Sequence, residues 1–104
     1  MKTLHDMITL PMGMEECSQL MGDLMELPVD YILSNRGEFE KRIYFLGVGF
    51  AETGIDDFTV KDEPLVAKFA DWLDDTYRQL GSPDKSIAND FRLTVADVKK
   101  ILSQ

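Results

Sequence analysis

The chain has 104 residues, which is enough for one hydrophobic core and too few for two domains that each bury a sizeable core. Hydrophobic residues make up 44% of it, an ordinary fraction for a globular protein, which argues against wholesale disorder. Its 19 acidic and 11 basic residues give a net charge of −8, which repels nucleic acid and attracts basic surfaces. Residues 83–104 do not share this negative charge, since they contain three acids and four bases. Any binding of nucleic acid therefore has to involve them.

Composition also bears on location. No segment approaches the roughly 20 consecutive apolar residues of a membrane helix. The first residues lack the long apolar core and the small-residue cleavage site of a signal peptide. The single cysteine, Cys17, cannot form an internal disulfide, which fits a reducing compartment. We therefore expect a soluble, cytoplasmic protein with no membrane contact.

The chain begins with a short arm that ends at Pro11-Met12-Gly13. His5, the only histidine, lies in this arm, and we expect it to be a mobile surface residue. Apolar residues then recur at helical spacing over Met14–Met25, which predicts a helix that Pro28 ends or restarts. The methionine-rich stripe of this helix, with Cys17, is interpreted as core, and an adaptable contact surface is the alternative.

The central residues predict two short strands. Val29–Ser34 and Arg42–Phe50 are rich in β-branched and aromatic residues, and Asn35-Arg36-Gly37 between them is a turn signal. Gly47 and Gly49 argue against a helix in the second segment. We therefore expect a short central β-hairpin.

The last part of the sequence is more clearly helical, after a loop that Asp56-Asp57 indicates. Asp62 can cap a helix with Pro64 in its first turn, and Gly81 can end it. We expect Trp72 to anchor the core beneath this helix. Two shorter helices, over 82–90 and 95–102, would complete a three-helix unit. The apolar face of the first helix comprises Leu65, Phe69, Trp72, Leu73, Tyr77 and Leu80.

Residues suited to catalysis or to a cofactor are missing. One histidine and one cysteine make no zinc signature. The segment from Asp84 fails as a calcium loop, because Val95 stands where the terminal bidentate acid belongs. Gly47-Val48-Gly49 lacks the third glycine and the lysine of a phosphate-binding loop. We expect no enzyme, no metal and no cofactor, and instead a protein that binds another macromolecule.

Residues 86–102 resemble the helix-turn-helix of bacterial and phage regulators. Ile87, Ala88 and Phe91 stand at the inward positions of its first helix, and Val98 and Ile101 at those of its second. The resemblance implies a short helix held by a few apolar contacts, so that its outer face can enter the major groove. The sequence departs from the family at Arg92, where a glycine in the left-handed conformation is usual. The alternative is a helical hairpin that only packs the C-terminus.

The same resemblance implies a DNA-binding surface of seven residues. Asp97 would approach the groove and, together with the net charge, would oppose binding. The expected base contacts come from Thr94, Val95, Ala96 and Lys99, and the expected phosphate contacts from Lys85, Arg92 and Lys100.

The region 52–75 is strongly acidic, with eight acids against two bases. On the predicted helix Asp71, Asp74 and Asp75 share one face, at spacings of three and four residues. An ordinary solvated face is one interpretation. The other is a surface that imitates DNA phosphates and occupies a basic groove, through Asp56, Asp57, Asp71, Asp74 and Asp75. The segment Ala70–Asp75 is similar to part of a small phage anti-CRISPR protein of the DNA-mimic kind.

These observations predict a mainly α single domain, with the β-hairpin making α+β the alternative. Residues 1–60 would form an interaction or dimerisation half, and residues 61–104 a helix-turn-helix-like half. The leading functional hypothesis is a small non-enzymatic regulator, a homodimer that binds duplex DNA. The alternative is an acidic inhibitor or adaptor of a basic nucleic-acid-binding protein, including anti-restriction and anti-CRISPR factors.

Overall fold

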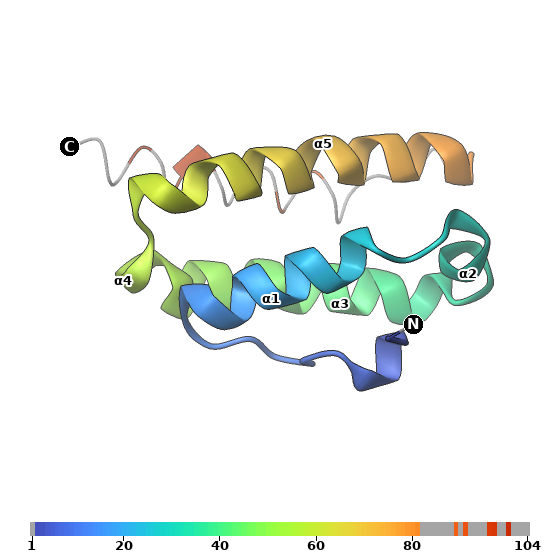
Figure 1. Ribbon diagram of the computed structural model, residues 1–104, viewed down its shortest axis with the longest axis horizontal. Coiled ribbons are helices and arrows are strands. Elements are labelled where there is room, and N and C mark those ends of the chain that lie inside the picture. Colours follow the sequence, from blue (N-terminus) through green and yellow to red (C-terminus); the bar gives the residue numbers. More distant parts are fainter. Residues whose placement is uncertain (1, 82–88, 90, 92–95, 98–99, 101–104) are drawn as a thin grey trace.

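The computed structural model describes residues 2–81, 89, 91, 96, 97 and 100, and in these residues the chain forms helices and no strand. The longest helix, α5, lies along one side of α1 and α3, and the N-terminal arm, residues 2–12, runs along the other side (Figure 1). The order of elements is the 3-10 helix η1 (Leu4–Asp6), α1 (Gly13–Met25), α2 (Val29–Ser34), α3 (Arg36–Gly49), the π-helix η2 (Phe50–Gly54), α4 (Ile55–Asp57), the 3-10 helix η3 (Val60–Asp62) and α5 (Glu63–Leu80).

The mainly α prediction is confirmed, but the central β-hairpin is wrong. Val29–Ser34 forms α2, and Arg42–Phe50 lies within α3 and the first residue of η2. The helical period becomes visible once Phe39 is included, because the buried side chains then follow at steps of four, three and four residues. They are Phe39, Ile43, Leu46 and Phe50. The turn signal at Asn35 joins two helices, and Asn35 ends α2 by donating its side-chain amide to the Tyr31 carbonyl oxygen, at 2.9 Å.

Close packing explains Gly49, one of the two glycines that argued against a helix, whereas a side chain at Gly47 would make only an ordinary contact. A Cβ on Gly49 would lie 3.0 Å from Cγ of Pro11 and closer still to the Pro11 carbonyl oxygen. A Cβ on Gly47 would meet the Phe91 ring at 3.8 Å. Gly49 therefore lets the arm approach the helix closely, and tertiary contact outweighs its low helix propensity. The loop expected at Asp56-Asp57 is also wrong, since both residues belong to α4.

The predicted helices α1 and α5 are confirmed. Gly81 ends α5 in the left-handed conformation, with φ of 69°, and Pro64 lies in its first turn. Asp62 precedes the helix, but its carboxylate accepts hydrogen bonds from the backbone N–H and the hydroxyl of Thr59 instead of capping α5. Trp72 is half-buried, so it borders the core rather than anchoring its centre.

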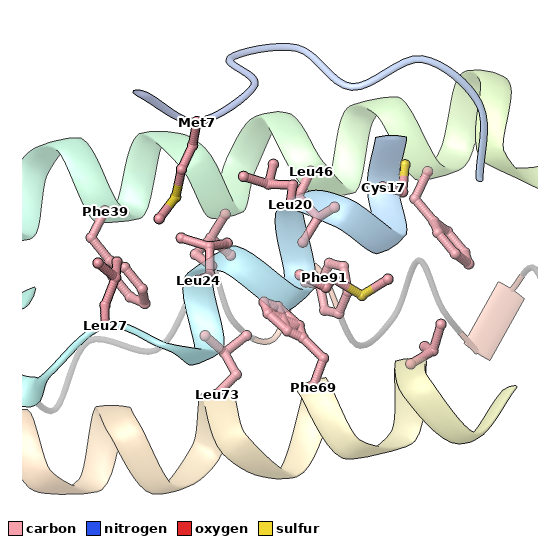
Figure 2. Close-up of a cluster of buried hydrophobic side chains, with 14 of the residues drawn as sticks. Met7, Cys17, Leu20, Leu24, Leu27, Phe39, Leu46, Phe69, Leu73 and Phe91 are labelled. Carbon is pink, nitrogen blue, oxygen red and sulfur yellow. The ribbon is translucent and has the colours of Figure 1, made fainter. Parts of the chain in front are cut away.

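A single hydrophobic cluster joins the arm, α1, α3 and α5 (Figure 2). The methionine-rich stripe of α1 belongs to it, since Met14, Cys17 and Met21 are buried, which confirms the interpretation as core. Phe91 is also buried, and its ring meets that of Phe69 edge-on at 5.4 Å. The buried side chains of the Met14–Met25 helix are therefore part of the core of the domain.

Candidate functional site

Hydrogen bonds through Thr53 attach the π-helix η2 to the start of α1. The backbone N–H of Gly13 donates to the Thr53 hydroxyl oxygen at 2.7 Å, and that hydroxyl donates to the Gly49 carbonyl oxygen at 2.8 Å. A Cβ on Gly54 would lie 3.5 Å from the Sγ of Cys17, so η2 also packs closely on the first turns of α1. These contacts place the short α4 helix beside the beginning of α1.

This arrangement gathers exposed carboxylates at one end of the molecule, which we call the acidic end. A Cβ on Gly13 would lie 3.0 Å from Oδ2 of Asp57, so this carboxylate stands over the amino-terminal end of α1, where a negative charge is favourable. Glu16 accepts a hydrogen bond from the backbone N–H of Met12 at 2.9 Å. The acidic end comprises Glu15 and Glu16 of α1, Glu52 of η2, and Asp56 and Asp57 of α4, all exposed.

Within residues 2–81, the elements that form the acidic end supply no basic residue to neutralise it. The segments that form α1, η2 and α4 contain no lysine and no arginine. Within the described residues, Glu15, Glu52 and Asp56 form no ion pair and no hydrogen bond through their side chains. Charges within a Debye length of about 8 Å act jointly on a molecule that approaches. Among residues 2–81, the acidic end is therefore a negative surface without a base of its own.

The five acids that were predicted to act together lie on two helices, α4 and α5. Asp56 and Asp57 lie at the acidic end, whereas Asp71 is eight residues into α5, about 12 Å along the helix axis. Asp71 and Asp75 are exposed, and Asp75 pairs with Arg78 at 3.2 Å. Asp74 is half-buried. The α5 acids thus form a second, partly neutralised group.

Glu15 and Glu16 were not predicted from the sequence to belong to an acidic surface. The available signal was the lack of bases: no lysine or arginine occurs between Lys2 and Arg36, nor between Arg42 and Lys61. That signal marks α1, η2 and α4 as uniformly acidic, but it does not reveal that they meet in space.

Most of the predicted DNA-binding residues lie outside the described part of the chain, namely Lys85, Arg92, Thr94, Val95 and Lys99. Ala96 and Lys100 are helical and exposed, as is Asp97. Phe91, expected at an inward position, is buried. The helix-turn-helix resemblance stays a prediction.

Cys17 is a buried free thiol within the hydrophobic cluster. Burial, with a smaller effect of the Glu16 charge, raises the pKa of the Cys17 thiol to about 11, so the nucleophilic thiolate is scarce at neutral pH. His5 is exposed on the arm. The described residues contain no cluster of histidine, cysteine or acidic side chains arranged to hold a metal ion.

In the part of the chain that the structure describes, no helix combines the length and the apolar character that crossing a bilayer requires. Neither the family models nor the curated proteins and solved structures with which the chain was compared gave a match.

Proposed function

We propose that the protein is a non-enzymatic binding protein whose acidic end docks on a basic surface of a partner. The observation that carries the proposal is the convergence of five exposed carboxylates from three elements that contain no base. Residues 2–81 hold 16 of the 19 acids but only 7 of the 11 bases, so the body around this surface is acidic as well. The field of the whole molecule then steers basic partners toward it.

The chemistry of carboxylates defines the partner. Like charges held close together repel, and the lysines and arginines of a partner relieve that repulsion on binding. Arginine adds specificity because its planar guanidinium bonds a carboxylate through two parallel hydrogen bonds. Surfaces rich in lysine and arginine line the nucleic-acid grooves of DNA- and RNA-binding proteins. The proposed partner is therefore a basic nucleic-acid-binding protein, whose groove the acidic end would occupy in place of phosphates.

Two charge-matched variants test this proposal. Glu52→Gln with Asp56→Asn removes two charges from the acidic end. Glu26→Gln with Asp30→Asn removes two exposed charges, one at the C-terminal end of α1 and one in α2, and α2 lies at the opposite end of the molecule from α4 in Figure 1. Each variant and the wild type would be used as bait in extracts of the native host. The captured protein would then be purified and titrated with each variant by calorimetry at two salt concentrations.

We expect the acidic-end variant to lose about tenfold or more in affinity, while the control stays within about threefold of the wild type. Displacement of a labelled duplex from the partner would show that the two compete for one groove. If both variants lost affinity equally, net charge alone would explain the loss, and this result would contradict a localised binding surface.

A second candidate, the DNA-binding regulator, is favoured by one specific observation. Phe91 is buried against Phe69, while Ala96 and Lys100 are exposed helical residues, as a helix-turn-helix requires of its inward and outward positions. A mobility shift of duplex DNA at low salt tests it. Lys99→Glu with Lys100→Glu should abolish the shift, and each lost phosphate contact should flatten the log–log salt dependence by about 0.9.

A further inference from the structure

The helix α3 and the π-helix η2 that continues it carry apolar side chains on two opposite sides. The buried side runs from Phe39 to Phe50 in steps of four, three and four residues. Two positions after each of its members comes a member of a second set, and two residues turn an α-helix by about 200°. This second set therefore lies on the opposite side, which we call the outer face. It comprises Lys41, Phe45, Val48 and Glu52.

The middle of the outer face exposes aromatic and aliphatic surface. Phe45 and Val48 are only half-buried, and Tyr44 beside them is 57% exposed. The rings of Tyr44 and Phe45 meet edge-on with centroids 5.5 Å apart, so they form one aromatic patch. Pro11 packs against the residue after Val48, so its chain neighbour Leu10, which is 50% exposed, lies nearby. Adjoining exposed apolar side chains mark an interaction surface more often than a scattered single one does.

A base and an acid lie at the two ends of the outer face. Lys41 is exposed in the first half of α3, and Glu52 is exposed in η2, about 16 Å further along the helix axis. Neither side chain forms an ion pair with another of the described residues. The outer face is therefore positive at its beginning, apolar in its middle and negative at its end.

This order of charges is complementary to itself when a second copy runs in the opposite direction. In a two-fold symmetric pair, residue i of one copy meets residue j of the other, and j meets i. A contact between Phe45 of one copy and Val48 of the other centres the pair between residues 46 and 47. The same centre places Lys41 opposite Glu52, so two ion pairs flank the apolar contacts. A parallel pair in register would instead place like charges opposite each other, which is unfavourable.

We infer that the outer face of α3 is a homodimer interface, on which two copies of the chain pack antiparallel. In this dimer Phe45 packs against Val48 of the second copy. Lys41 and Glu52 form an ion pair across the interface at each end. The apolar stripe of α1 is buried in the core, so within the predicted dimerisation half, residues 1–60, α3 provides a surface that is open to a second copy. One helix face from each copy makes a small interface, and we expect a reversible dimer. The inference goes beyond the docking of the acidic end, with which this interface shares only Glu52.

Charge reversal in the full chain tests the inference, because each substitution occurs twice in a symmetric dimer. Lys41→Glu brings two carboxylates together at each end of the interface, and Glu52→Lys brings two ammonium groups together. We expect each single reversal to raise the dimer dissociation constant about tenfold or more, as measured by sedimentation equilibrium. Both reversals in one chain restore opposite charges and should return the constant to within about threefold of the wild type. An equimolar mixture of the two single variants should likewise form a heterodimer, because its cross-pairs again join opposite charges.

Matched controls separate this interface from general effects of charge and apolar surface. Lys68→Glu changes an exposed lysine of α5, and it should leave the dissociation constant within about threefold of the wild type. Tyr44→Ser should raise the constant about tenfold, whereas Leu33→Ser, at a residue of α2 that is 55% exposed, should not. Circular dichroism checks that each variant is folded.

Three results would overturn the inference. A wild-type monomer up to millimolar concentration would do so and would leave the outer face to a different protein. A dimer that withstands both single reversals, or a dissociation constant that the combined reversals do not restore, would place the interface elsewhere on the molecule. The readout is the mass of the protein alone, so a failed dimer would leave the proposed binding by the acidic end untouched.

Discussion

A substitution at Gly49 tests how closely the arm packs on α3. Gly49→Ala places a methyl group where the Pro11 carbonyl oxygen lies, with Cγ of Pro11 only 3.0 Å away. The obstacle includes backbone, which cannot move aside as the end of a flexible side chain can. The matched control is Gly22→Ala in α1, where a Cβ meets nothing within 4 Å.

The two substitutions are expected to have opposite signs. Alanine in place of glycine within a helix stabilises by about 0.5–1 kcal/mol, and this gain applies to both positions. At Gly49 the forced displacement of the arm costs about 1–3 kcal/mol, as for other overpacked sites. Gly22→Ala should therefore raise the free energy of unfolding by about 0.5–1 kcal/mol, and Gly49→Ala should lower it by about 1–2 kcal/mol.

Urea denaturation followed by Trp72 fluorescence measures both values, because Trp72 is half-buried between Phe39 and Phe69, with ring centroids at 6.0 and 5.5 Å. Circular dichroism at 222 nm provides an independent signal. If Gly49→Ala stabilised as much as Gly22→Ala, the close approach of Pro11 to α3 would be refuted, and with it the account of why a glycine occupies this position.

Three further predictions follow from the core and its edge. Trp72→Ala should lower the free energy of unfolding by about 2–3 kcal/mol, less than for a fully buried tryptophan, as measured by circular dichroism in urea. Because burial raises the pKa of Cys17 from 9.0 to about 11, its neutral thiol stabilises the fold below pH 9, and this contribution is lost as the pH rises toward 11. The free energy of unfolding should fall over that range by up to about 2 kcal/mol more than in Cys17→Ala; parallel pH profiles would contradict the raised pKa. Light scattering at micromolar concentration should give about twice the chain mass of 11.8 kDa if the proposed homodimer forms, and a monomer mass throughout would exclude it.

The helices α1 and α5 could be predicted because their signals are local. An apolar stripe at helical spacing, Pro64 near the start of α5 and Gly81 at its end are all properties of neighbouring residues. The central β-hairpin failed because Gly49 was interpreted locally, as a helix breaker. A glycine is needed at position 49 because Pro11, 38 residues earlier in the chain, packs against it. A contact between residues so far apart in the sequence leaves no local pattern.

The candidate site was predictable in part for the same reason. The abundance of acids identified Asp56 and Asp57, but their association with Glu15 depends on the hydrogen bond from Gly13 to Thr53, which joins residues 40 positions apart. Helical spacing correctly placed Asp71 and Asp75 on an exposed face. It did not reveal that Asp75 pairs with Arg78. Helical spacing thus describes one face of an element, and tertiary contacts decide which faces act together.

The start of α1 links the N-terminal arm to the acidic end. The Thr53 hydroxyl bonds to Gly13 on one side and to Gly49 on the other, and Gly49 is the residue on which Pro11 rests. The frame that holds Asp57 over α1 therefore depends on the packing of Pro11 against Gly49, a contact between residues 38 positions apart.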